Sequence, residues 1–149
     1  MHRILVVEDE SHLAEGLRFN LEAEGYAVGS AEDGPAGEKA LNEASEPFGL
    51  VILDVMLPER NGFDILKTLR ERGVKTPVIL LTSKGLESDK LEGFARGADD
   101  YVTKPFSIRE VQSRIKVLIN RYERMTPLDR AKTDNKKLHC CYVDEERKQ

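Results

Sequence analysis

The sequence predicts an α/β protein with a doubly wound, five-stranded parallel sheet and five helices. Two observations support this fold class. Five short strand-like runs occur, and the runs 4–7, 50–53 and 78–81 are apolar at every position, which is typical of strands buried on both faces. A segment with helical spacing of its apolar residues follows each run, and helical crossovers of this kind join parallel strands. The expected architecture is a sheet between two layers of helices.

The first strand and helix have the clearest pattern. Residues 4–7 read Ile-Leu-Val-Val, a β-branched apolar run of strand length. After it, Leu13, Leu17 and Leu21 recur at four-residue spacing, which places them on one face of a helix. Gly25 follows as the expected end of that helix.

The second and third strands and helices repeat this pattern. Residues 26–30 predict a strand, and the stretch around 34–44 predicts the helix after it. The apolar run 50–53 predicts the third strand, and the helix that follows begins at residue 62 and ends at Gly73.

The last two strand–helix units follow the same pattern. The run 78–81 precedes a predicted helix from about 88 to 95, and the short strand 100–103 precedes a helix near 107–122. Beyond this helix the apolar periodicity stops, so we expect one domain over residues 1–124. Residues 125–149 are predicted to be a linker or disordered tail without an effector domain, since they are too few and too polar to form a core.

Composition excludes several classes of protein. The 149 residues carry a net charge of -4, which argues against a chain that coats nucleic acid. The longest apolar runs are far shorter than the ~18 residues of a membrane span. The two cysteines, Cys140 and Cys141, are adjacent and do not suit a disulfide framework. We therefore expect a cytoplasmic protein without membrane contact.

Polar side chains stand where the predicted strands end. Glu8 and Asp9 follow the first strand, Asp54 the third, Thr82 the fourth, and Lys104 the fifth. Each alone has an ordinary structural explanation, such as a helix cap, a turn or a solvated lysine. Together they are informative, because the carboxyl ends of parallel strands form one edge of the sheet, where ligands bind.

The residue types at this edge suit phosphoryl transfer. Three converging carboxylates would repel one another unless a cation lay among them, and Mg²⁺ is the ion that fits such oxygen ligands while leaving room for phosphoryl oxygens. Lys104 adds a positive charge and Thr82 a hydroxyl donor. Asp54 is the candidate nucleophile, because it lies between the acidic pair and the Thr82–Lys104 side.

The motifs around these residues resemble the receiver domain of two-component response regulators, a CheY-like domain with the flavodoxin-like strand order 2-1-3-4-5. The similarity spans about residues 3–124 and is greatest to the OmpR/PhoB-type subfamily. Four segments carry the resemblance: 4–10 (ILVVEDE), 54–58 (DVMLP) with Gly62, 81–83 (LTS) and 97–106 (GADDYVTKPF).

The resemblance implies a phosphorylation switch. Asp54 would accept a phosphoryl group from a sensor histidine kinase. Asp9 and Asp54 would ligate Mg²⁺ together with the Met56 carbonyl oxygen, while Glu8 would act mainly through a water molecule. Mn²⁺ is expected to substitute for Mg²⁺. The protein would catalyse its own phosphorylation and dephosphorylation without being a conventional turnover enzyme.

The family also assigns the residues that transmit the signal. Lys104 would pair with the phosphate, aimed by a cis bond before Pro105. Thr82 would bind a phosphoryl oxygen, and its inward movement would let the Tyr101 ring turn in. The surface of the fourth helix, fifth strand and fifth helix would then change by a shift in populations.

By similarity to OmpR/PhoB-type receivers, that surface would form a homodimer on phosphorylation. Lys90 with Glu110, and Asp100 with Arg114, are the expected pairs across a two-fold axis. The six interface candidates are Lys90, Asp99, Asp100, Glu110, Arg114 and Lys116. The alternative is a solvated charged face, because single surface ion pairs contribute only about 0–1 kcal/mol.

The output admits three hypotheses. In the first, the chain is the receiver part of a transcriptional regulator that binds DNA only through an effector domain absent from this chain. In the second, it is a stand-alone regulator that acts by protein contacts. The third, ranked last, is a phosphatase that forms an aspartyl phosphate, which would need a second acid two residues after Asp54, where Met56 stands.

Overall fold

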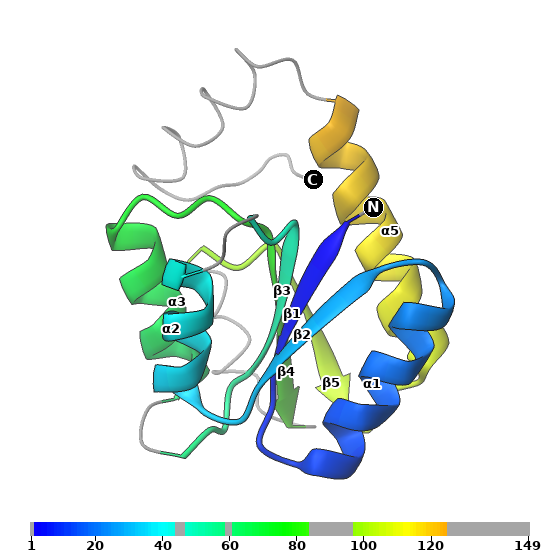
Figure 1. Cartoon of the computed structure of the whole chain (residues 1–149), viewed down its shortest axis with the longest axis horizontal. Coiled ribbons are helices and arrows are strands. Elements are labelled where there is room, and N and C mark those ends of the chain that lie inside the picture. Colours follow the sequence, from blue (N-terminus) through cyan, green and yellow to red (C-terminus); the bar gives the residue numbers. More distant parts are fainter. Residues whose placement is uncertain (1, 44–46, 59–60, 84–96, 125–149) are drawn as a thin grey trace.

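The computed structural model describes residues 2–43, 47–58, 61–83 and 97–124. Strands and helices alternate from β1 to β4, as the apolar pattern predicts, and β5 is followed by α5 (Figure 1). The elements are β1 (Arg3–Val7), α1 (Ser11–Ala23), β2 (Ala27–Ala31), α2 (Gly34–Glu43), β3 (Leu50–Asp54), α3 (Gly62–Glu71), β4 (Val78–Ser83), β5 (Asp100–Lys104) and α5 (Ile108–Arg124). The helix predicted over 88–95 lies outside the described residues.

The five strands form one parallel sheet in the order β2-β1-β3-β4-β5, which confirms the predicted fold class and strand order. The register brings the strand ends into line. Val7 is opposite Leu53 across β1 and β3, so Glu8 follows at the level of Asp54. Ser83 is opposite Lys104 across β4 and β5. The predicted site residues therefore share one edge of the sheet.

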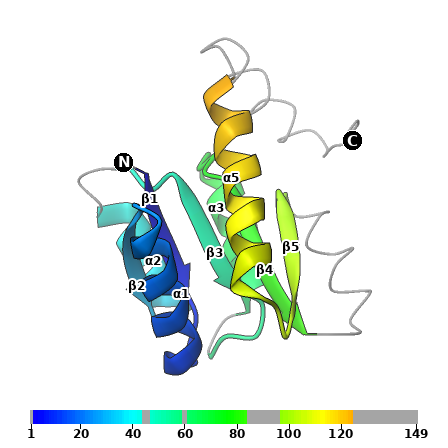
Figure 2. The same ribbon diagram turned by 90° about the vertical axis from the view of Figure 1, so that its right-hand side faces the viewer.

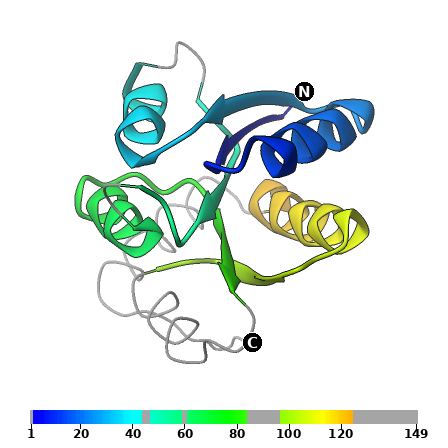
Figure 3. The same cartoon turned by 90° about the horizontal axis from the view of Figure 1, so that it is seen from below.

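Two layers of helices cover the sheet. Seen from below, α1 and α5 lie on one face, and α2 and α3 on the other (Figure 3). The side view shows α5 in front of the sheet and α3 behind it (Figure 2). Every helix in the described part of the chain is too short or too polar to span a bilayer.

Alternate residues of each strand feed two separate cores. In β1, Ile4 and Val6 join the core beneath α1 and α5, whereas Leu5 and Val7 join the core beneath α2 and α3. All four are at most 1% exposed. Burying such a side chain stabilises the fold by roughly 1.5–3 kcal/mol, so burial on both faces explains why apolar residues stand at successive positions.

Caps fix where two of the helices begin. The Asn61 side chain accepts a hydrogen bond of 2.9 Å from the Asp64 amide at the start of α3. The Ser107 hydroxyl accepts one of 3.1 Å from the Glu110 amide at the start of α5. These bonds satisfy amides that have no partner within the helix. Both helices start beside the carboxyl edge of the sheet.

Candidate functional site

The candidate site lies at the carboxyl edge of the sheet, where the chain order of the strands changes direction. From β1, one crossover leads outward to β2, while β3 lies on its other side. Ligands bind at such a switch point, because the connections diverge there and leave a crevice. Glu8 follows β1, Asp54 ends β3, Thr82 lies near the end of β4 and Lys104 ends β5.

Three carboxylates converge at this edge. Glu8, Asp9 and Asp54 each offer an oxygen atom, and these atoms lie within 4.8 Å of one another. Glu8 and Asp54 are buried, at 1% and 3% exposure, whereas Asp9 is exposed to solvent. An exposed carboxylate beside two buried ones leaves an open approach for a cation that still carries water.

Lys104 supplies the positive charge to this cluster. Its ammonium nitrogen lies 3.0 Å from Asp54 Oδ2, to which it donates a hydrogen bond, and 3.1 Å from Glu8 Oε1. Burial favours the neutral amine, but the pairs with Asp54 and Glu8 outweigh it and hold the pKa of Lys104 above its usual value. Within the described part of the chain, one ammonium thus pairs with two buried carboxylates, and this cluster is net negative.

The negative charge of Asp54 affects the pKa of Glu8. Burial, followed by the hydrogen bond and repulsion from Asp54, raises the pKa of Glu8 from 4.5 to about 7. A backbone hydrogen bond of 3.1 Å from the Glu10 amide opposes the shift without cancelling it. A divalent cation would remove the repulsion, so the charge of this cluster fits an oxygen-bound metal ion.

The Thr82 hydroxyl is a second polar group of this edge whose surroundings suit a ligand. Thr82 is 2% exposed, and its Oγ1 has no hydrogen-bond partner within the described part of the chain. An unsatisfied buried hydroxyl is costly, by about 1–3 kcal/mol. A phosphoryl oxygen is an acceptor that would satisfy it.

The loop after β3 is held tightly against Asp54. The Met56 amide donates a hydrogen bond of 3.0 Å to Asp54 Oδ1, which orients the carboxylate. The Gly62 amide donates to the Val55 carbonyl at 2.8 Å. A Cβ on Gly62 would overlap the Asp54 carbonyl oxygen, so only glycine fits there. The Met56 side chain, in contrast, is 63% exposed.

The predicted switch residue and cis bond are both on β5 or next to it. The peptide bond between Lys104 and Pro105 is cis, as the resemblance implied. Tyr101 is half-buried and packs against the core beneath α2 and α3. A groove of about 470 Å³ runs along the outer side of β5, with Tyr101, Lys104 and Arg114 among its lining residues.

Two neighbouring aspartates of the predicted interface pair within the chain. Arg114 donates hydrogen bonds of 2.9 and 2.8 Å to the two Asp100 oxygens and lies 3.4 Å from Glu110. The hydrogen bond that Arg114 donates to Asp100 raises the pKa of Arg114 above its usual value. Asp99 instead pairs with Arg70 of α3 at 3.2 Å. The predicted contacts to a second copy stay predictions.

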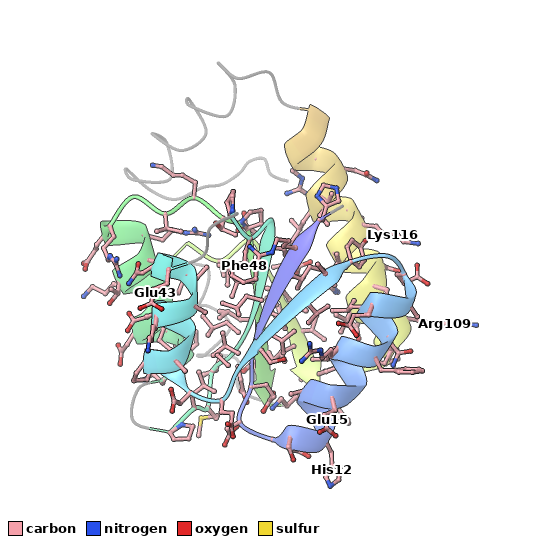
Figure 4. The ribbon with its side chains drawn as sticks, in the orientation of Figure 1. His12, Glu15, Glu43, Phe48, Arg109 and Lys116 are labelled. Atoms are coloured by element: carbon pink, nitrogen blue, oxygen red, sulfur yellow. The ribbon has the colours of Figure 1, made fainter. Side chains whose placement is uncertain are left out.

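The other two interface candidates differ in what the structure describes. Lys116 projects outward from α5 and lies 3.6 Å from Glu24, beyond the end of α1 (Figure 4). Lys90 lies outside the described residues. Arg70 was not identified from the sequence. An arginine in a surface helix has no local sequence feature that predicts a contact with a residue next to a distant strand.

Comparison with known proteins agrees with this geometry. The response regulator receiver domain family matches residues 4–116. The transcriptional regulatory protein PhoP for alkaline phosphatase synthesis in Bacillus subtilis is 45% identical over 133 residues, which are 89% of this chain and 54% of that protein. CpxR of Escherichia coli is 45% identical over 121 residues, or 81% of this chain and 50% of that protein. The chain spans about half the length of these curated relatives.

Solved structures show the same fold. The receiver domain of the Francisella response regulator 1452 superposes with a TM-score of 0.77 at 33% identity, covering 82% of this chain and 99% of that one. The receiver domain of TorR, a response regulator of the TMAO respiratory system, gives 0.75 at 36% identity, covering 81% and 98%. The chain therefore belongs to the response regulator receiver domain family, with similarity to OmpR/PhoB-type regulators.

Proposed function

We propose that Asp54 is the phosphoryl acceptor of this receiver and that a sensor histidine kinase is the donor. The observation that carries this proposal is a buried carboxylate at the switch point, oriented by the Met56 amide and 3.0 Å from the Lys104 ammonium. In the transfer, an Asp54 oxygen attacks the phosphorus atom. The bond from phosphorus to the kinase imidazole nitrogen breaks, and an acyl phosphate forms.

Mg²⁺ is the metal we assign to the acidic cluster, with Mn²⁺ as a substitute. Asp9, Asp54 and the Met56 carbonyl oxygen would hold it, and Glu8 would act mainly through water. The fit rests on three carboxylates whose oxygens lie within 4.8 Å and two of which, among the described residues, are paired with a single lysine. When bound, the ion would offset the negative charge of the phosphoryl oxygens.

Lys104 and Thr82 have complementary roles in the phosphorylated state. Lys104 would exchange its contact with Asp54 for a phosphoryl oxygen, keeping its charge because its pKa is raised. The buried Thr82 hydroxyl would donate to another phosphoryl oxygen. To make this bond Thr82 would move toward the phosphoryl group. The space it leaves would let Tyr101 turn inward and change the surface of β5 and α5.

The output we propose is dimerisation of the phosphorylated form. The surface includes Asp100, Glu110 and Arg114, with Lys90 as a further candidate. The curated relatives named above are transcriptional regulators, and the matched segment covers only 54% and 50% of their lengths, which supports an output on DNA through a further domain. A stand-alone regulator that acts by protein contacts is the alternative. Sequencing the native reading frame beyond residue 149 distinguishes the two.

An acyl-phosphate donor with Mg²⁺ tests the phosphorylation step. We expect one phosphoryl adduct per chain by intact mass, absent in Asp54→Asn and retained in the control Asp64→Asn, which changes an aspartate of α3 outside the cluster. Continuous phosphate release from a range of monoesters would indicate a phosphatase instead.

Sedimentation tests the output separately. The phosphorylated wild type should form dimers, and Arg114→Ala should weaken them. A wild type that stays monomeric at high micromolar concentration while fully phosphorylated would contradict the dimer, but it would leave the acceptor role of Asp54 intact.

A further inference from the structure

A second ion pair, largely shielded from solvent, lies at the opposite edge of the sheet, just before β5. Arg70, on the last turn of α3, uses all five of its N–H groups. Its Nη1 donates to the carbonyls of Val74 and Thr76, both at 2.9 Å. Its Nε and Nη2 donate to the Gly97 carbonyl at 3.2 and 3.1 Å, and Nη2 also reaches Asp99 Oδ2 at 3.2 Å. Arg70 thus joins the approaches to β4 and β5.

Asp99 extends the pairing of β4 and β5 by one step. The first paired residues of these strands are Ile79 and Asp100. One position earlier, the Asp99 amide donates to the Val78 carbonyl at 3.0 Å, and Asp99 Oδ2 accepts from the Val78 amide at 2.9 Å. The side chain therefore replaces a backbone acceptor at the start of the ladder, while Arg70 neutralises its charge.

Gly97 makes this arrangement possible. Its φ of +97° is disfavoured for residues with a Cβ. A Cβ there would also lie 3.3 Å from both Cγ and Nε of Arg70. The backbone turn at Gly97 directs its carbonyl oxygen toward the guanidinium of Arg70, and the absence of a side chain leaves room for that group.

Asp99 and Asp100 are adjacent in sequence but differ in accessibility. The side chains of Asp99 and Arg70 are each 12% exposed. Those of Asp100 and Arg114 are 22% and 39% exposed. Successive strand residues point to opposite faces of a sheet, so Asp99 is bound to α3 and Asp100 to α5. Asp100 and Arg114 are exposed enough to separate and pair with charges of another molecule. Separating Asp99 from Arg70 would instead leave a largely buried charge without a counter-charge.

We infer that Asp99 and Arg70 form an intrachain clamp that fixes the start of β5, and that Asp99 is not a contact to a second copy. The clamp holds the strand that carries Tyr101 and Lys104. The exchangeable pair Asp100–Arg114 is the one that faces a partner. The second half of this inference rests on the proposed dimer, whereas the clamp itself does not.

Thermal unfolding of the unphosphorylated protein tests the clamp without reference to dimers. Asp99→Asn should lower Tm by about 5–10 °C, since it leaves Arg70 buried without a counter-charge. The matched change Asp100→Asn should lower it by less than about 3 °C, as expected of a more exposed pair. Adding Arg70→Met to Asp99→Asn should cost little more than either change alone. Equal effects of the two aspartate changes would overturn the clamp.

Two further readouts separate a local clamp from general loss of stability. Hydrogen exchange of the Val78 amide should accelerate in Asp99→Asn and not in Asp100→Asn. Arg70→Lys should fail to restore the clamp, because one ammonium cannot make the five bonds of the guanidinium, whereas Arg114→Lys should keep its pair. An unchanged Val78 exchange rate in Asp99→Asn, or an unaffected Tm in Arg70→Lys, would contradict the inference.

Sedimentation of the phosphorylated variants tests the interface, at a temperature below each Tm. Asp100→Asn should weaken the dimer about tenfold, and Asp99→Asn should stay within about twofold of the wild type. If Asp99→Asn weakens the dimer as much as Asp100→Asn does, Asp99 is not separate from the interface. A wild type that never dimerises would refute the proposed output. The clamp would then still be tested by the unfolding experiments.

Discussion

At the carboxyl end of β5, Lys104 faces two buried carboxylates, Glu8 and Asp54, and cannot neutralise both. Just before the amino end of the same strand, Arg70 faces one carboxylate, Asp99, and its remaining N–H groups all meet carbonyl oxygens. Both regions contain an ion pair that is largely shielded from solvent. They differ in whether the pair is satisfied by the protein alone.

This difference indicates what each edge is for. At the amino edge, the five N–H groups of Arg70 all meet acceptors, so this pair with Asp99 can be rigid without a ligand. The carboxyl edge holds excess negative charge and the unsatisfied Thr82 hydroxyl, both of which a metal ion and a phosphoryl group would correct. Incomplete satisfaction is costly for stability and is expected where a ligand completes the structure.

The largest effect should come from Lys104→Met. Removing the ammonium takes away the side-chain cation that would stabilise the phosphoryl oxygens beside the metal ion, so we expect phosphorylation by an acyl-phosphate donor to slow by about 10²–10³-fold. The rate of adduct formation by intact mass measures this. Arg109→Met, which removes an exposed cation of α5 (Figure 4), is the control and should react at the wild-type rate. Equal rates for the two variants would remove Lys104 from the site.

A smaller effect should follow from Thr82→Val, which we expect to make the unphosphorylated protein more stable. The change removes a buried hydroxyl that has no partner among the described residues, so the unfolding free energy should rise by about 1–2 kcal/mol. Urea unfolding of the unphosphorylated protein measures the gain. The same variant should dimerise less when phosphorylated. A loss of stability would mean that the hydroxyl already has a partner.

Glu8 predicts opposite pH dependences with and without metal. Its pKa in the folded protein is about 7, above the ordinary value of 4.5. Without metal, the protonated form favours folding, so the unfolding free energy should fall as pH rises from 4.5 to about 7. Mg²⁺ binds the carboxylate form, so its affinity should rise by up to about tenfold per pH unit below this pKa and then level off.

Calorimetric Mg²⁺ titrations and urea unfolding in a chelator, each repeated across this pH range, measure the two trends. Glu8→Gln is the control and should flatten both. An Mg²⁺ affinity that does not change between one pH unit below and one above the pKa would show that Glu8 is already ionised.

The smallest effect should come from the pair outside both regions. Lys116 and Glu24 are 60% and 40% exposed, so the pair is screened by water. We expect Lys116→Ala to change the unfolding free energy by less than about 1 kcal/mol, with a further decrease of the effect in high salt. A larger loss in urea unfolding would show that this pair fastens α5 to α1.

Much of the fold could be predicted because the signals are local. The run at residues 4–7 is apolar at every position, since β1 is buried on both faces, and this alone distinguishes a parallel sheet. Boundaries shifted slightly: Thr82 lies within β4, one residue beyond the predicted run, and α5 begins at Ile108 rather than 107. Hydrogen bonding between strands extends them past the last strongly apolar residue.

The candidate site was also accessible from sequence, but its electrostatics were not. Glu8, Asp9, Asp54, Thr82 and Lys104 stand at strand ends, and parallel pairing brings strand ends together. That Glu8 is nearly fully buried and Asp9 exposed depends on the path of the chain after β1. The pKa of Glu8 follows from that burial, so no spacing could have given it.

The sequence by itself determined the order of elements, the parallel sheet and the set of residues at its carboxyl edge, because apolar periodicity and strand ends are local properties. Only the tertiary structure decided which charges meet. Asp99 and Asp100 are indistinguishable in sequence, yet one binds Arg70 and the other Arg114. Each partner is brought near by helices packed on opposite faces of the sheet, and the distances between such elements depend on the packing of the whole domain.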